Sequence, residues 1–276
     1  MRHECAHRSI DVRHSRLTVP LATSYTGGSV HAYLLHGRVP TLIDAPPGGA
    51  SFVAALQASL SAAGDGPLAQ VIVTHAHHDH IGGSAALHAA FPSVVFRKRA
   101  PLPDAPPEWT AIDGEPMLTA GDAQLWALHT PGHAVDHTCL FDVHSGVLFG
   151  GDLAINGSTV SIPADSGGGL RQYLRSLRAV LELQPRLLLP AHGEPITQPA
   201  SLLRGYLSHR MAREQQVLEC LAAGLDTADR LVERLYAALA ADLQGAARQT
   251  VLAHLLKLEE DGRIERTGES WHLRSA

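Results

Sequence analysis

The chain has 276 residues, 45% of them hydrophobic and 18% charged, which is the composition of a globular protein with a buried core. The net charge is −5 with histidine neutral, which excludes a surface that is basic throughout, as a nonspecific nucleic-acid binder would have. No apolar run approaches the roughly 20 residues that a membrane-spanning helix needs, so we expect no membrane partner.

The cysteines and the N-terminus indicate a cytoplasmic protein. Cys5, Cys139 and Cys220 are far apart and odd in number, which predicts neither a disulfide framework nor a cysteine-rich zinc site. The first ten residues are charged and lack the apolar segment of a signal peptide.

Strand and helix signals alternate over the first 200 residues. In the first half, we expect strands at 31–35 and 41–44 joined by a hairpin turn, a helix at 52–62 capped by Ser51, a strand at 71–73, a helix from 82–83, and a strand at 94–96. The second half predicts strands near 118, at 124–129, 137–143 and 147–150, a helix at 170–183, and a strand at 187–189. Residues 98–116 and 153–169 are predicted loops. The pattern predicts two sheets sandwiched between helices.

Strand signals stop near residue 200, and three helices follow at 203–223, 227–241 and 246–260. A hairpin, RIERTGESWHL, comes next. Three helices and a hairpin form a winged-helix-like pattern. We therefore predict one domain over 1–200 and a winged-helix-like domain over 201–276.

The stretch VIVTHAHHDHIGG (71–83) crowds four histidines and an aspartate at the end of a buried strand. Because side chains alternate along a strand, His75 and His77 point to one side, while Asp79 and His80 approach from the following turn. His78 faces away and is given no role. Imidazoles and a carboxylate suit zinc, with iron or manganese as alternatives.

One such cluster rarely fills two metal sites, and three further strand ends carry candidate ligands. TPGH places His133 after the 124–129 strand, GGD places Asp152 after the 147–150 strand, and PAHG places His192 after the last strand. Each candidate has a small or glycine neighbour that lets backbone and ligand approach closely.

The series H-x-H-x-D-H, TPGH, GGD and AHG, in this order, resembles the metallo-β-lactamase superfamily over nearly all of 20–196. The resemblance implies a four-layer αβ/βα sandwich and two divalent ions. It also implies a ligand set in which His75, His77 and His133 hold one metal, Asp79, His80 and His192 hold the second, and Asp152 bridges them.

The tail narrows this resemblance. Residues 206–218, LVERLY (231–236) and HLLKLEEDGRIE (254–265) resemble the lactamase-beta-two-like branch, which carries a C-terminal winged-helix-like domain. Members of that branch are similar to a single-strand-specific endoribonuclease or to thioesterases. Two departures stand out: His31 replaces a frequent Asn, and Asp44-Ala45-Pro46-Pro47 replaces the usual Asp-Thr-Gly. Asp44 could still orient a ligand imidazole.

The expected chemistry is hydrolysis by a hydroxide that bridges the two metals. Asp79 would bind a metal and orient that hydroxide, so it is the predicted catalytic residue. His137 is either a proton donor or a hydrogen-bonded structural residue. Cys139 is expected to be a core residue.

Three functions compete: hydrolysis of a small thioester, ester or lactone, cleavage of single-stranded RNA, and a regulatory DNA-binding role. Residues 206–276 hold nine Lys/Arg against eleven Asp/Glu, a net charge of −2, which argues against sequence-specific DNA binding. RNA needs a basic groove with stacking aromatics, and only Arg97, Lys98 and Arg99, near Trp109, offer one. A small-molecule substrate is therefore favoured, with single-stranded RNA as the alternative.

Overall fold

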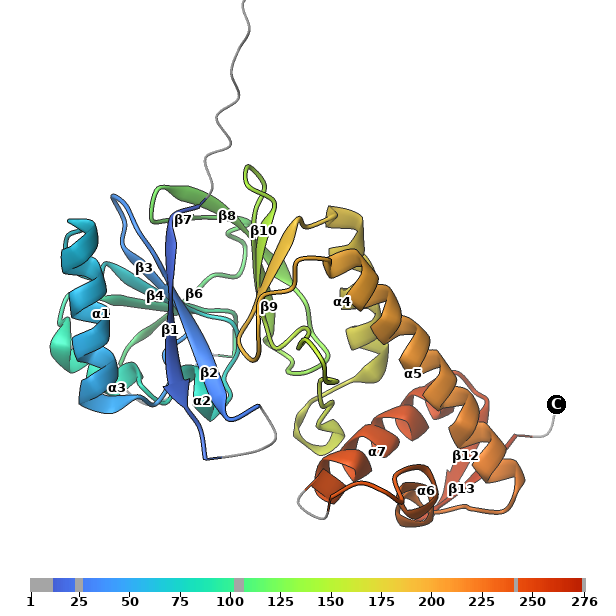
Figure 1. Cartoon of the computed structure of the whole chain (residues 1–276). Coiled ribbons are helices and arrows are strands. Elements are labelled where there is room, and N and C mark those ends of the chain that lie inside the picture. The colour runs from blue at the N-terminus through green and yellow to red at the C-terminus, as the bar shows by residue number, and fades with distance from the viewer. Residues whose placement is uncertain (1–11, 23–26, 102–106, 241–242, 275–276) are drawn as a thin grey trace, which may run out of the picture.

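The computed structural model describes residues 12–22, 27–101, 107–240 and 243–274. Cys5 lies outside this part of the chain. Two sheets pack face to face in the larger part of the molecule, and the C-terminal helices form a second lobe (Figure 1). Among the described residues, no helix has the length and apolar character to cross a membrane.

The first sheet has six strands in sequential order: β1 (His14–Pro20), β2 (Ser29–Leu35), β3 (Thr41–Ile43), β4 (Gln70–Val73), β5 (Val95–Lys98) and β6 (Trp109–Ala111). The predicted hairpin is confirmed, since β2 and β3 pair antiparallel with Leu34 opposite Leu42. β6 corrects the prediction of an uninterrupted loop over 98–116. It pairs with β5 because Trp109 buries its ring against Phe96, with 5.4 Å between ring centroids.

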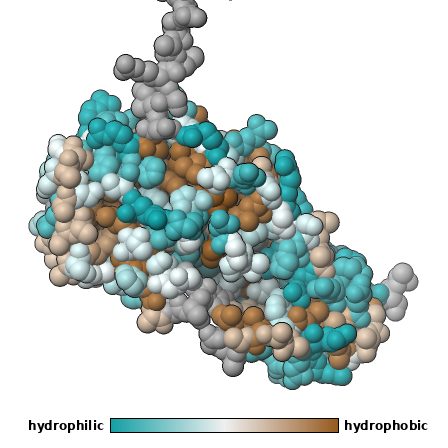
Figure 2. Space-filling model, viewed as in Figure 1, coloured by the Kyte–Doolittle hydropathy of each residue, from teal (hydrophilic) through white to brown (hydrophobic). Residues whose placement is uncertain are grey.

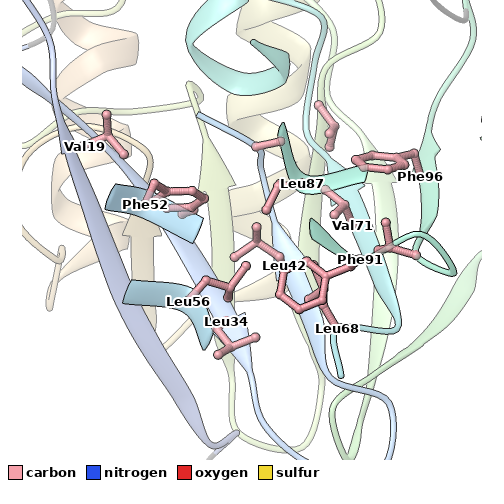
Figure 3. Close-up of a cluster of buried hydrophobic side chains, with 14 of the residues drawn as sticks. Val19, Leu34, Leu42, Phe52, Leu56, Leu68, Val71, Leu87, Phe91 and Phe96 are labelled. Atoms are coloured by element: carbon pink, nitrogen blue, oxygen red, sulfur yellow. The ribbon is translucent and has the colours of Figure 1, made fainter. Parts of the chain in front are cut away.

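The outer face of this sheet is covered by α1 (Gly49–Ala63) and α3 (Ser84–Ala90), and the short α2 (His78–Ile81) precedes α3 in the chain. Phe52 and Leu56 of α1 pack against Leu34 and Leu42 of the sheet (Figure 3). Ser51 does not cap the helix as predicted: it lies in the first turn and its hydroxyl donates to the carbonyl of Gly48.

The second sheet has the order β11-β10-β9-β8-β7. Its strands are β7 (Met117–Ala120), β8 (Ala123–His129), β9 (Thr138–Asp142), β10 (Val147–Gly151) and β11 (Leu187–Pro190). On its outer face lie α4 (Leu170–Leu183), the 3-10 turn η1 (Ala164–Ser166) and the first turns of α5 (Pro199–Ala222).

A third apolar core lies between the two sheets, where Ile72 of β4 and Phe149 of β10 are both buried. Alternation along β4 explains the layering, because Val71 and Val73 point into the outer core while Ile72 points inward. The predicted four-layer αβ/βα sandwich is confirmed.

The C-terminal lobe contains the second half of α5, α6 (Ala228–Leu235), α7 (Gln244–Glu260) and the hairpin of β12 (Ile264–Thr267) and β13 (Ser270–Leu273). Its core includes Val217, Val251 and Trp271. Much of its visible surface is hydrophilic (Figure 2). α5 belongs to both lobes, since Leu203 packs under the second sheet and Val217 packs in the C-terminal core. The boundary at residue 200 therefore stays a prediction, close to the start of a shared helix.

Candidate metal centre

The seven predicted ligands lie in the connections that follow four strands of the two sheets. His75 and His77 follow β4, and Asp79 and His80 lie in the short helix α2, which was not predicted. The helix expected to begin near Gly82-Gly83 is confirmed as α3, which begins at Ser84. The remaining ligands follow strands of the second sheet: His133 after β8, Asp152 after β10, and His192 after β11. His78 is exposed.

The first cluster joins three imidazoles. His77 Nδ1 lies 3.0 Å from His75 Nε2 and 2.9 Å from His133 Nε2. These three nitrogens form one of the groups whose ligand atoms all lie within 4.8 Å of one another. The predicted set His75, His77 and His133 is thus brought together, although its role in holding a metal stays a proposal.

Hydrogen bonds on the outer side of the His133 and His75 imidazoles determine which ring nitrogen of each is unprotonated and faces into the site. His133 Nδ1 donates to the carbonyl of Ser161 at 2.9 Å, so its Nε2 carries no proton when the ring is neutral. Thr74 gives its single hydroxyl proton to Asp44, so His75 Nδ1 must donate to Thr74 Oγ1 at 3.1 Å. Two lone pairs therefore face His77 Nδ1, which has at most one proton. A cation resolves this repulsion.

The second cluster consists of Asp79, His80 and His192. Asp79 Oδ2 lies 3.3 Å from His192 Nε2 and 3.8 Å from His80 Nε2. Here too the outer nitrogens are held: His80 Nδ1 donates to Asp44 Oδ2 at 2.9 Å and His192 Nδ1 donates to the carbonyl of Ser29 at 2.6 Å. Both Nε2 atoms therefore point into the site.

Asp152 lies between the two clusters. Its Oδ2 is 3.3 Å from His133 Nε2, and its Oδ1 is 3.3 Å from His192 Nε2 and 3.5 Å from His80 Nε2. The carboxylate thus turns one oxygen to each cluster, as a bridging ligand would.

The unpartnered atoms of the site match a set of metal donors. His80 Nε2, His192 Nε2 and Asp152 Oδ1 are buried and make no hydrogen bond with the described residues. Buried polar atoms are rarely left unpaired, and these three converge on one point. Nitrogen and carboxylate oxygen are the donors that zinc and iron accept, so the residues present fit a pair of divalent ions.

Electrostatics agree with this fit. Burial lowers the pKa of His75 well below its usual value, which keeps the imidazole neutral and able to donate a lone pair. Burial also lowers the pKa of His80, but Asp44 and Asp152 outweigh it and raise this pKa well above the usual value. The two carboxylates therefore require positive charge at His80, which a proton or a metal ion supplies.

Asp44 and His137 hold the ligands in place. Asp44, with φ of 66°, accepts from Thr74 N at 2.8 Å as well as from His80. His137 Nε2 accepts from Asp152 N at 3.0 Å, and its Nδ1 donates to Thr130 Oγ1 at 2.8 Å. Both ring nitrogens of His137 make hydrogen bonds and burial lowers its pKa to about 3, which favours the structural alternative over the proton donor.

Two glycines of the motifs allow the close approaches that the site needs. Gly151 has φ of 50°, and a Cβ there would lie 2.9 Å from both His137 Nε2 and Thr74 Oγ1. At Gly132, with φ of 138°, a Cβ would lie 2.4 Å from the backbone of Tyr173. These contacts explain the glycines in GGD and TPGH.

Sequence reasoning assigned no supporting role to four groups: Thr74, the carbonyls of Ser29 and Ser161, and His31, which it had noted only as a departure from the family pattern. His31 Nε2 lies 3.0 Å from the carbonyl of Gly193, beside His192, and burial lowers the pKa of His31. A threonine directly before the first histidine was a usable signal for Thr74. A backbone carbonyl leaves no signal in the sequence.

The predicted RNA-binding cluster is not a free basic surface. Lys98 is fully buried and pairs with Asp136 at 2.8 Å. Arg97 pairs with Glu115 at 2.5 Å and Arg99 pairs with Asp113 at 2.8 Å. Trp109, the aromatic residue expected beside them, is buried in the outer core.

A four-layer sandwich with histidines and aspartates converging at its strand ends defines a metal-dependent hydrolase. The particular family follows from comparison with known proteins. The chain belongs to the metallo-beta-lactamase superfamily, whose model matches residues 25–192, and residues 227–271 match the beta-lactamase associated winged helix domain.

Three curated relatives illustrate the range of the family. Beta-lactamase-like protein 2 homolog of Drosophila melanogaster is 34% identical, over 70% of this chain and 69% of its own. Thioesterase pkgB of Emericella nidulans is 37% identical, over 56% of this chain and 43% of its own. Atrochrysone carboxyl ACP thioesterase of Aspergillus fumigatus is 30% identical, over 75% of this chain and 68% of its own.

Solved structures share the fold. Metallo-beta-lactamase family protein TTHA1429 of Thermus thermophilus superposes with a TM-score of 0.79 at 22% identity, covering 95% of this chain and 98% of its own. TTHA1623, solved in a di-iron-bound form, has a TM-score of 0.52 at 27% identity, covering 66% of this chain and 96% of its own.

Proposed function

We propose that this chain is a thioesterase that hydrolyses thioesters of small acyl groups with the help of two divalent metal ions. The observation that carries the metal-dependent part is the convergence of the bare nitrogens of His80 and His192 on Asp152 Oδ1, all three unpartnered. The thioester is favoured because two relatives, Thioesterase pkgB and Atrochrysone carboxyl ACP thioesterase, are named for that activity.

In this proposal, His75, His77 and His133 hold one ion, Asp79, His80 and His192 hold the other, and Asp152 bridges them. Zinc is the proposed metal because imidazole-rich sites favour it, and the di-iron form of TTHA1623 makes iron the alternative. Thr74, Ser161, Ser29 and Asp44 keep four of the five imidazoles, all except that of His77, in the tautomer that presents its lone pair inward.

Bound divalent ions would lower the pKa of water to about 7 and polarise the thioester carbonyl. Asp79 is the proposed catalytic residue: its side chain is 23% exposed, so this carboxylate of the site is accessible to solvent and could orient the attacking group. Cys139 is no alternative nucleophile, because it is buried and burial raises the pKa of its thiol to about 12.

The pairing of Arg97, Lys98 and Arg99 with carboxylates favours a small substrate over RNA. A single-strand groove needs cations that are free to neutralise phosphates, and each cation of this cluster already has an acidic partner. Single-stranded RNA remains the alternative substrate against which the proposal is tested.

The test is a parallel activity screen of the zinc-loaded and iron-loaded protein on acyl thioesters, esters, lactones and single-stranded RNA. We expect release of free thiol from thioesters, and its loss in Asp79→Ala, with the circular dichroism spectrum unchanged. Cleavage of RNA without thioester hydrolysis would replace the proposed function by the alternative.

A further inference from the structure

A pocket of about 240 Å³ lies between the segment that follows β10 and the helices of the C-terminal lobe. One wall is Ser158–Ser161, and the opposite wall includes His209, Arg210 and Arg213 of α5 and Thr250 of α7. None of the described residues that line it carries a carboxylate. The arginines Arg210 and Arg213 have no part in the proposed metal centre.

Arg210 is 2% exposed and makes no ion pair with a described residue. Its guanidinium donates to the carbonyl of Val160 and lies 5.6 Å from the centre of the Tyr173 ring. A buried charge normally has a partner of opposite charge, because desolvation is otherwise uncompensated. Among the described residues, Arg210 contacts the Val160 carbonyl and the Tyr173 side chain, neither of which carries a negative charge.

Arg213, one turn further along α5, also makes no ion pair with a described residue. It stacks on Tyr236 at 4.3 Å and donates to the carbonyl of Leu235 at 3.3 Å, but its Nε is buried without a hydrogen-bond partner. His254 of α7 is fully buried, and both of its ring nitrogens also lack a partner among the described residues. Burial and then Arg210 and Arg213 lower the pKa of His254 to about 3.

Carboxylates are present in the same lobe but serve other cations. Lys257 on α7 pairs with Glu214 and Asp261, each at 2.7 Å. The described acidic residues thus leave Arg210 and Arg213 without a counter-charge, and an anion is the ligand whose chemistry completes the site.

One short segment of the chain contacts both the pocket and the proposed metal centre. Ser161 lines the pocket, and its carbonyl accepts the hydrogen bond that orients His133. The neighbouring Val160 carbonyl accepts from Arg210. A substrate held by the arginines would therefore lie beside the wall that supports a proposed metal ligand.

We propose that Arg210 and Arg213 form a phosphate-binding pocket that holds the phosphorylated carrier arm of the thioester substrate. This inference rests on the proposed function and names its substrate class. The substrate is an acyl group on a 4′-phosphopantetheine arm, which is either part of coenzyme A or attached to a carrier protein. Guanidinium groups bind phosphate with paired, charge-assisted hydrogen bonds, which distinguishes such an arm from an uncharged thiol carrier.

The test compares an acyl-pantetheine with the same acyl-4′-phosphopantetheine, since the two thioesters differ only in the phosphate. We expect the wild-type KM to be lower for the phosphorylated thioester. Arg213→Gln should raise that KM by about tenfold or more, the effect of one lost charge-assisted hydrogen bond, and leave the KM of the neutral thioester unchanged. The matched control is Arg204→Gln, because Arg204 is exposed on the same helix and does not line the pocket.

Calorimetric binding of S-methyl-4′-phosphopantetheine, which cannot be hydrolysed, separates this inference from the activity. Equal KM values for both thioesters, or equal binding by wild type and Arg213→Gln, would overturn the phosphate pocket while leaving a thioesterase. Binding that Arg213→Gln abolishes, with no hydrolysis of either thioester, would support the anion site and reject the proposed activity. Acyl-coenzyme A identifies the source: use equal to that of the phosphopantetheine thioester supports a coenzyme A substrate, and poorer use supports a carrier-bound arm.

Discussion

Asp44 Oδ2 accepts a hydrogen bond of 2.9 Å from His80 Nδ1, which turns the opposite nitrogen of the same imidazole toward Asp152. Asp44 also accepts from the backbone and hydroxyl of Thr74, so one carboxylate fixes both the end of β4 and a ligand of the second cluster. Asp44 makes these hydrogen bonds although Ala45-Pro46-Pro47 follows it in place of the usual Thr-Gly.

Replacing Asp44 should weaken metal binding more than it weakens the fold. In Asp44→Asn, an amide must face both the Thr74 N–H and His80, and it can accept from only one oxygen. We expect metal affinity to fall on the order of 10–100-fold, as for other outer partners of metal-bound histidines. Competition with a chromophoric chelator measures this. The exposed Asp122→Asn is the control, and an unchanged affinity in Asp44→Asn would reject the role given to Asp44.

His137 should matter for stability and not as a proton donor. His137→Phe leaves Asp152 N and Thr130 Oγ1 without their partner, which costs on the order of 2–6 kcal/mol of unfolding free energy. Urea denaturation measures this loss, with the exposed His144→Phe as control. If the variant kept its unfolding free energy but lost turnover, a direct catalytic role would have to be assigned to His137 instead.

The buried pair of Lys98 and Asp136 ties the first sheet to the segment that carries His133. Lys98→Met leaves the carboxylate of Asp136 buried without its counter-charge, which should cost about 3–5 kcal/mol. Lys98→Met combined with Asp136→Leu should recover much of this loss. By contrast, Arg38→Met breaks an exposed pair with Asp122 and should cost less than about 1 kcal/mol. A loss for Lys98→Met as small as the control would show that the pair contributes little.

His254 should make the protein sensitive to acid. The folded pKa is about 3 and the unfolded value is 6.5, so the unfolded chain alone binds this proton between those pH values. Unfolding free energy should therefore fall by about 1.4 kcal/mol per pH unit as pH decreases through this window. His254→Leu should remove that part of the slope, whereas Thr250→Val should shift the curve without changing the slope. Parallel slopes for wild type and His254→Leu in denaturation from pH 3 to 7 would exclude this account.

The sequence predicted the strand ends of the site because their signals are local: an apolar strand, a glycine and a polar ligand lie within a few residues. It did not predict the burial of Lys98, since Asp136 is distant in the chain and its approach depends on how the sheets pack. The proline-rich composition of 98–116 predicted a loop instead of β6. This strand forms because Trp109 packs against the ring of Phe96. The helix expected from Gly82-Gly83 is present as α3, but the sequence did not predict the short α2 before it, because a four-residue helix is too short for a periodic apolar pattern.

The central claim is that His75, His77 and His133 on one side and Asp79, His80 and His192 on the other hold two metal ions. Elemental analysis of the purified and reconstituted protein tests it most directly, with His133→Ala and Asp79→Ala beside the wild type. The account predicts about two zinc or iron ions per wild-type chain, fewer in each variant, and loss of turnover in both variants. A wild-type protein that binds no metal after reconstitution, or variants that keep both ions and full activity, would contradict it.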